Sequence, residues 1–265
     1  MNIDQKRSIW HSGSRPWEKI PRWLLPLVII LLVATVFFIG QYAASLILSF
    51  YAVFRGWNTA QANNWLNSSV IAQFLFVILF EGFNVLLLWL ILRRYGKKLS
   101  SLGLKKLRLR DGGYGLVAYP AYLIIYLIVI GLVTHFVHGL NLNQSQNIGF
   151  NSVHGTTQMV LTFISLVILP PIAEELLFRG LLFEGLKKSM PVVYAGLITS
   201  LIFAAAHLQE GGGGSLFWVG SIDVFILSLV LVFLKQKTKS LWPGIFLHAI
   251  KNAVAFIYLF VLTSR

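Results

Sequence analysis

The sequence contains no cysteine and few charged residues. Of its 265 residues only 9 are Asp or Glu, and charged residues of both signs make up 12% of the chain. The absence of cysteine excludes disulfide bonds, thiolate metal ligands and cysteine nucleophiles. The charge content is about half of the roughly 25% found in soluble globular domains, so the chain does not have the composition of a soluble protein.

Long apolar runs dominate the chain instead. Hydrophobic residues make up 57% of the sequence, and the mean hydropathy is +0.75. Several runs reach about 20 residues, the length that crosses a hydrocarbon layer of about 30 Å. Backbone groups inside a membrane must be satisfied within the protein, which favours helices. We therefore expect an all-α fold, a polytopic transmembrane helical bundle of seven spans, with room for an eighth helix or a re-entrant segment in the fourth region.

The apolar runs place the spans. They cover residues 23–51, 70–92, 115–137, a segment from about 159 into a charged motif at 174–179, and then 192–207, 216–234 and 242–262. The first run follows a basic segment but is too long for a signal peptide, whose apolar region has about 7–15 residues. We divide the chain into a basic N-terminal segment (1–22), two spans with a basic loop (23–114) and a core (115–262).

The distribution of basic residues predicts the orientation. If the spans alternate, 19 of the 22 Lys and Arg residues lie on one side, with eight in residues 93–110 and none in residues 138–158. Basic loops stay in the cytoplasm, so we expect a multi-pass protein of the cell membrane with a cytoplasmic N-terminus and an external C-terminus. The basic loop has no interleaved aromatic residues and no RNA-binding motif, so the expected partner is the lipid bilayer and not nucleic acid.

Residues 170–180 place two carboxylates and an arginine inside an apolar run. Each charge at membrane depth costs about 2.5–3.5 kcal/mol, which favours a function for the group. Glu175 and Arg179 are four residues apart, in the favourable order for a helical ion pair, and we assign them structural support. Pro170 and Pro171 are expected to break or kink the helix and to leave Glu174 near a first helical turn, free for chemistry.

Three further polar residues follow in later spans. His207 ends the fifth span, while His248 and Asn252 lie four apart on one face of the seventh. A single histidine in a helix is usually a packing residue, but together these groups are costly unless they converge. At about 1.5 Å per residue they reach a common depth. We expect them to meet Glu174 at a cavity that water enters from the cytoplasmic side.

Other polar features have simpler interpretations. Glu81 with Asn84, and Asp223 with Lys251, are expected to form polar contacts between helices. Residues 209–215 are rich in glycine but lack the lysine of a phosphate-binding loop, so they are expected to be a flexible connector.

Three motifs together carry a family resemblance. Glu174-Glu175-x-x-x-Arg179, Phe203-x-x-x-His207 and His248-x-x-x-Asn252 occur in this order in successive apolar segments. They resemble the motifs of the CPBP intramembrane proteases, a group of CAAX prenyl endopeptidases and bacteriocin-processing or self-immunity proteins, over roughly residues 115–262. The resemblance implies cleavage of a membrane-associated protein or peptide, as in CAAX-like processing, bacteriocin or pheromone maturation, or self-immunity. It also implies catalytic roles for Glu174, His207, His248 and Asn252.

Residue chemistry allows two mechanisms. Glu174 can activate water with His207, while His248 and Asn252 can stabilise an oxyanion. A metalloprotease with Zn²⁺ bound by Glu174, His207 and His248 is the alternative. The sequence has no H-E-x-x-H pair, and an asparagine amide is a poor zinc ligand, so no cofactor is favoured.

Two other classes compete with a peptidase. One is a non-proteolytic bacteriocin-immunity or membrane scaffold protein that binds a partner. The other is a transporter, which would also bury acids and histidines, but the sequence lacks the internal repeat of spans that many transporters show.

Overall fold

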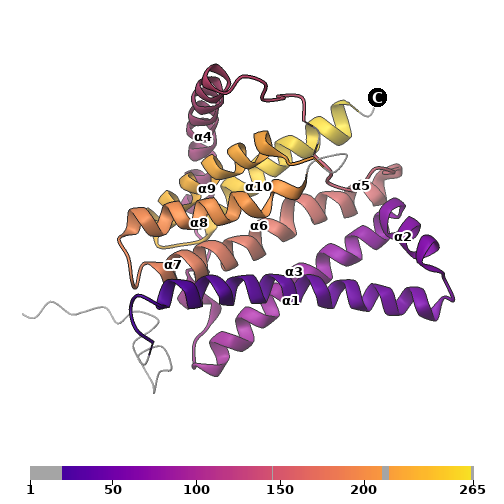
Figure 1. Cartoon of the computed structure of the whole chain (residues 1–265), viewed down its shortest axis with the longest axis horizontal. Coiled ribbons are helices and arrows are strands. Elements are labelled where there is room, and N and C mark those ends of the chain that lie inside the picture. Colours follow the sequence, from indigo (N-terminus) through magenta and orange to yellow (C-terminus); the bar gives the residue numbers. More distant parts are fainter. Residues whose placement is uncertain (1–19, 145, 211–214, 264–265) are drawn as a thin grey trace, which may run out of the picture.

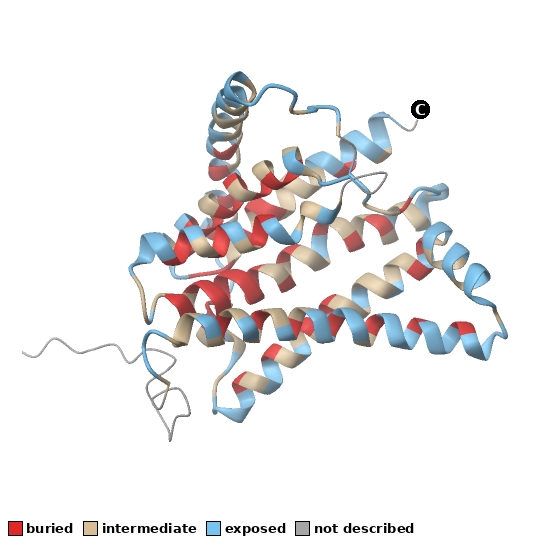
Figure 2. Ribbon diagram, in the orientation of Figure 1, coloured by how far each residue is buried: buried red, intermediate tan, exposed pale blue. Residues whose placement is uncertain are grey.

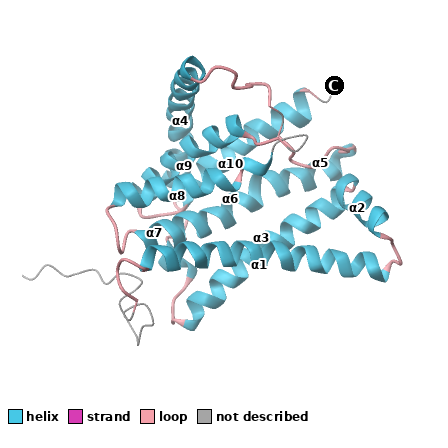
Figure 3. Cartoon of the chain, in the orientation of Figure 1, coloured by secondary structure: helices cyan, strands magenta, loops and turns pink. Residues whose placement is uncertain are grey.

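The computed structural model describes residues 20–144, 146–210 and 215–263. Within these ranges the chain forms helices and connecting loops, with no β-strand (Figures 1 and 3). Seven helical segments are long and apolar enough to cross a membrane. The predicted all-α bundle of seven spans is confirmed.

The observed spans agree with the predicted ones to within a few residues at most ends. They are α1 (Leu25–Phe54), α3 (Val70–Arg94), α4 (Leu109–Phe136), a composite helix over 155–186, α8 (Val192–Ala206), α9 (Trp218–Thr238) and α10 (Trp242–Phe256), which continues as a π-helix over Ile257–Leu262. One clear difference is the start of α4, six residues before the predicted one. There the Arg108 backbone N–H donates to the Asp111 carboxylate at 2.9 Å, which caps the helix within the basic loop.

A short helix occupies much of the segment expected to be the first loop. It is α2 (Thr59–Ser68), and it begins with a reciprocal cap. The Gln61 backbone N–H donates to Asn58 Oδ1, and the Asn58 backbone N–H donates to Gln61 Oε1, both at 2.9 Å. This helix is too short to span a membrane and adds no eighth crossing.

The fourth span is one continuous helix, so of the predicted break or kink at the prolines the break does not occur. It contains α5 (Gly155–Phe163), α6 (Leu169–Glu174) and α7 (Glu184–Leu186), joined by π-helical turns at Ile164–Ile168 and Glu175–Phe183. Pro170 and Pro171 therefore do not start a new helix, and Glu174 has no free N-terminal turn beside it. The wider π turn ahead of the prolines relieves the clash between a proline ring and the carbonyl four residues earlier.

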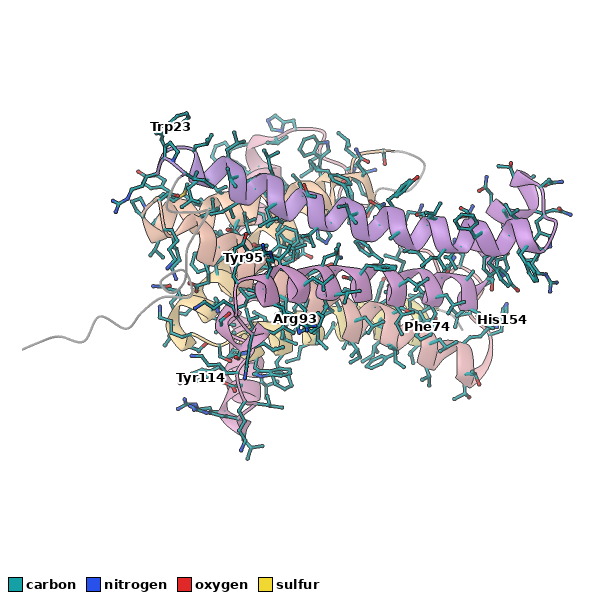
Figure 4. The ribbon with its side chains drawn as sticks, turned by 90° about the horizontal axis from the view of Figure 1, so that it is seen from below. Trp23, Phe74, Arg93, Tyr95, Tyr114 and His154 are labelled. Carbon is teal, nitrogen blue, oxygen red and sulfur yellow. The ribbon has the colours of Figure 1, made fainter. Side chains whose placement is uncertain are left out.

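The two ends of the bundle differ. The loops at 95–108, 187–191 and 239–241 lie at one end, here called the basic end. The loop residues 146–154, 207–210 and 215–217 lie at the opposite end. Figure 4 shows Trp23, Tyr95 and Tyr114 toward the basic end, and Phe74 and His154 at the other. Nearly all of the fourth span close to α7 is buried (Figure 2), so the core is densest in the basic half of the bundle.

Glycines let two helices approach the centre closely. A Cβ at Gly115 of α4 would lie 2.9 Å from the backbone nitrogen of Leu247, so this glycine sets the contact between α4 and α10. A Cβ at Gly244 of α10 would lie 2.9 Å from the Glu175 carboxylate. Small residues permit such close packing between membrane helices. Gly244 thus brings α10 against the charged part of the fourth span.

Both expected polar pairs are present. Lys251 of α10 lies 3.3 Å from Asp223 of α9, and the Tyr122 hydroxyl of α4 donates to the same carboxylate, which ties three helices together. Asn84 donates to Glu81 at 3.2 Å within α3, and Asn84 Oδ1 packs against Gly40 of α1, so this pair lies at a contact between two helices.

Candidate active site

The four residues predicted to be catalytic line a single cavity. Glu174, His207, His248 and Asn252 come from α6, the end of α8, and α10, and they surround a space of about 280 Å³. Four other polar residues share its wall: Gln146, Asn147, Glu210 and Lys251. The structure therefore brings together groups that are up to 78 positions apart in the sequence.

Glu174 presents a carboxylate oxygen to this cavity. Its Oε2 atom is buried and has no hydrogen-bond partner within the described part of the chain. The nearest basic atom is His248 Nε2, at 3.8 Å, which is too long for a hydrogen bond. A buried carboxylate oxygen without a protein partner is suited to hold a water molecule or a substrate group.

Glu175 and Arg179 form the predicted ion pair. Arg179 Nη1 donates to Glu175 Oε1 at 2.8 Å, and the two side chains are 0% and 1% exposed. The guanidinium also lies 4.3 Å from the centre of the Phe203 ring, a cation–π contact. Glu175 Oε1 in turn lies 3.6 Å from His248 Nδ1. The pair thus packs directly behind His248, whose ring lies between the two glutamates.

His207 is held by its own helix. Its Nδ1 lies 2.8 Å from the Phe203 carbonyl oxygen. A carbonyl only accepts, so Nδ1 carries the proton in this contact and Nε2 is the acceptor nitrogen of the neutral ring. Nε2 lies 4.0 Å from Glu210 Oε1. The end of α8 therefore fixes the tautomer of His207 and leaves Nε2 for a ligand in the cavity.

Asn252 has a hydrogen-bond partner that its position in the sequence does not predict. Its Nδ2 donates to the Leu166 carbonyl at 3.0 Å, which ties α10 to the fourth span. In an α-helix this carbonyl would accept from residue 170, and in a π-helix from residue 171, but both are prolines without an N–H. The double proline thus frees a carbonyl, and Asn252 satisfies it. One amide hydrogen of Asn252 remains for the cavity.

The side chains do not fit the alternative zinc site. Across residues 20–144, 146–210 and 215–263, no group of three or more His, Asp or Glu side chains is placed to hold a metal ion. Glu174 Oε2 and His248 Nε2 lie 3.8 Å apart and His207 Nε2 remains available for a ligand, but the three side chains do not converge into such a group. We therefore derive no catalytic step through a metal.

The cavity extends away from the basic end. Loop residues 146–148 and Glu210 line it, and they belong to the opposite end of the bundle. Among the described residues, none from the loops at 95–108, 187–191 or 239–241 lines it. If the basic end is cytoplasmic, as expected, this lining does not agree with the expectation that water enters from the cytoplasmic side, because buried residues of the core close that half.

Glu210 belongs to the segment predicted to be a flexible connector, yet it lines the cavity. Its backbone carbonyl accepts from the Asn147 N–H at 2.6 Å, and its side chain accepts from Gln146 Nε2 at 2.7 Å. The only sequence signal was an acid three residues after His207. Gly211 to Gly214, the centre of the predicted connector, lie outside the described residues.

The fold and the cavity define a polytopic membrane protein with a site suited to acid–base chemistry. Comparison with known proteins shows which family this region resembles. Residues 156–254 match the family model described as type II CAAX prenyl endopeptidase Rce1-like. This match contains all three motifs, and it is narrower than the expected range of 115–262. This part of the chain is therefore similar to the Rce1-like family, and the predicted resemblance to the CPBP intramembrane proteases is confirmed.

One curated relative supports the same family. It is the protein named "Putative membrane peptidase YdiL" of Bacillus subtilis (strain 168), which is 28% identical over 138 residues. The alignment spans 49% of this chain and 49% of the relative. No solved structure matches the chain.

Proposed function

We propose that this protein is an intramembrane endopeptidase that hydrolyses a peptide bond in a membrane-associated protein or peptide. The observation that carries the proposal is the convergence of Glu174, His207, His248 and Asn252 on one cavity. The similarity to the Rce1-like family and the membrane peptidase relative support this class of activity. CAAX-like processing, maturation of a bacteriocin or pheromone, and self-immunity are the biological settings that suit such an enzyme.

In the proposed mechanism Glu174 is the general base. Its unpartnered Oε2 takes a proton from a water molecule that His207 Nε2 helps to orient, and the oxygen of that water attacks the peptide carbonyl. The C–N bond then breaks, and the proton passes from Glu174 to the leaving amine. No metal takes part in these steps.

The developing oxyanion needs donors on the other side of the cavity. The remaining amide hydrogen of Asn252 and an N–H of His248 can supply them. Asn252 is fixed by its bond to Leu166, and His248 is fixed between the two glutamates. Such fixed donors stabilise the charge without reorganising during the reaction.

The proposal predicts that Glu174→Gln abolishes cleavage and leaves the protein folded. The amide retains the shape of the side chain but cannot accept the proton. Membrane peptides from cells with the wild-type and the variant protein can be compared by mass spectrometry to find cleavage products that need Glu174. The purified wild-type protein should then cleave a synthetic peptide of that sequence, with or without a zinc chelator.

Equal cleavage by the Glu174→Gln protein would refute the role of Glu174. Loss of wild-type cleavage in chelator, restored by Zn²⁺, would favour the metalloprotease instead. If cells with the Glu174→Gln protein show the same biological effect as cells with the wild type, and the two yield the same membrane peptides, the protein is a binding or immunity protein and not a peptidase.

A further inference from the structure

The shape of the cavity limits the side from which a substrate can arrive. From Glu174 the space runs between α10 and the loops of the opposite end, where Gln146, Ile148, Glu210 and Leu259 line it. Toward the basic end, Leu177, Leu181, Phe183 and Leu186 of the fourth span are at most 1% exposed. A peptide can therefore reach Glu174 from the opposite end without unpacking the core.

A loop segment beside the cavity, here called the cover segment, makes polar contacts on both of its sides. This cover segment, residues 146–150, bonds to Glu210 through Gln146 and through the backbone of Asn147. On its other side the Phe150 N–H donates to Gln73 Oε1 at 2.6 Å. A peptide backbone offers the same donors and acceptors, so it can exchange with these bonds at low net cost.

The charge distribution places this end of the bundle outside the cytoplasm. The basic end carries the loops with Lys and Arg, while residues 137–154 and 207–217 contain neither. Basic loops remain on the cytoplasmic side during insertion. The cavity mouth and the basic loops therefore lie on opposite sides of the membrane.

We propose that the active-site cavity opens to the non-cytoplasmic face of the membrane. The substrate is then an extended segment of an exported or membrane-anchored polypeptide at that face, which among the settings named above favours peptide maturation or self-immunity over CAAX-like processing of a cytoplasmic tail. The wall offers apolar pockets from Leu166, Val224, Leu227 and Phe256, so apolar side chains suit the residues beside the cleaved bond. This inference rests on the proposed peptidase function for the substrate, but the access side can be tested separately.

Cysteine labelling measures access independently of activity, because the chain has no cysteine of its own. Ala255→Cys places a thiol in the cavity wall. Ser100→Cys and Ser152→Cys report exposed positions at the basic and opposite ends, and Ala195→Cys is a buried control at 0% exposure. Each variant is treated with a membrane-impermeant maleimide on intact cells and after permeabilisation.

The expected result is labelling of Ala255→Cys and Ser152→Cys in intact cells. Ser100→Cys should react only after permeabilisation, and Ala195→Cys in neither condition. Labelling of Ala255→Cys only after permeabilisation, as for Ser100→Cys, would overturn the proposal. Protection of Ala255→Cys in both conditions would overturn it as well, because the cavity would not be open to water.

The substrate class is tested by the positions of cleavage sites. The products that need Glu174 should map to non-cytoplasmic segments of membrane or exported proteins. If they map to cytoplasmic tails, this inference fails while the peptidase function stands. If no product depends on Glu174, the peptidase function and the substrate class fail together, and only the labelling result on the access side stands.

Discussion

The two nitrogens of His207 have separate tasks in the proposed site. Nδ1 is occupied by the Phe203 carbonyl, four residues earlier on the same helix, and this bond sets the orientation of the ring. Nε2 faces the cavity wall near Glu210. A substitution that keeps the first task and removes the second can therefore distinguish chemistry from packing.

His207→Asn is expected to retain stability and lose activity. The asparagine amide can replace Nδ1 as a donor to the Phe203 carbonyl, but it has no atom at the position of Nε2. Cleavage should fall by about 10²–10⁴-fold, the usual contribution of acid–base assistance. Peptide cleavage and thermal unfolding in detergent measure the two effects, with His135→Asn, an exposed residue of α4, as the control. Full activity of His207→Asn would contradict a role for Nε2.

Several of these residue contacts could be predicted from the sequence, and others could not. The pair of Glu175 with Arg179 follows from helical spacing and the cost of isolated charge in a membrane. The bond from Asn252 to Leu166 could not be predicted, because it depends on which carbonyl the prolines leave free and on the position of another helix. Local spacing fixes contacts within a helix, whereas contacts between helices depend on packing.

At the scale of the elements, the fourth span combines two π-helical turns with two prolines. The sequence predicts a break or a kink here, because a proline inside a helix removes a hydrogen bond. The structure keeps the helix continuous and supplies the missing donor from α10. The carbonyl that the prolines leave free thus binds a neighbouring helix. The energetic coupling between Asn252 and Pro170 measures this contribution.

Asn252→Ala should destabilise the protein less when Pro170 is also replaced. In the wild type the loss of one interhelical hydrogen bond should cost about 0.6–1.7 kcal/mol. Pro170→Ala restores a backbone N–H that can donate to the Leu166 carbonyl, so the same substitution should then cost less. The four proteins of this cycle are compared by thermal unfolding in detergent. Pro120→Ala in α4 is the matched control and should leave the cost of Asn252→Ala unchanged.

The buried pair gives a second coupling within the fourth span. Glu175→Ala or Arg179→Ala alone leaves an unpaired buried charge and should cost on the order of 3–5 kcal/mol. The double substitution should recover part of this loss. Lys187→Ala, which breaks a more exposed pair at 3.1 Å, should cost less than about 1 kcal/mol. Thermal unfolding in detergent measures all four variants, and strictly additive losses for Glu175 and Arg179 would show that they do not interact.

At the scale of the whole molecule, charge and packing are both asymmetric along the bundle axis. At the basic end several lysine side chains lie close enough to repel one another. Desolvation lowers the pKa of Lys239 from its usual value, and the nearby cations of Lys187 and Lys105 lower it further. An anionic headgroup layer would relieve this repulsion, in agreement with a cytoplasmic position for this end.

The number of spans could be predicted from apolar length, but the position of the cavity along the bundle could not. Apolar run length follows directly from the thickness of a bilayer, so seven runs gave seven helices. The side on which the cavity opens depends on the cover segment and on the dense packing around the fourth span. Those features arise from contacts between distant segments, such as Asn147 with Glu210.

If all seven helices cross the membrane, the two termini lie on opposite sides, and from the distribution of basic residues we expect the N-terminus to be cytoplasmic. A fluorescent protein fused to the N-terminus should therefore fluoresce. The same protein fused to the C-terminus should be dark after export in an unfolded form, while alkaline phosphatase fused there should be active. A fusion within the basic loop, after Lys106, is the internal control and should fluoresce, since two spans precede it. Fluorescence from both termini would mean an even number of crossings, and one of the seven helices would then not span the membrane.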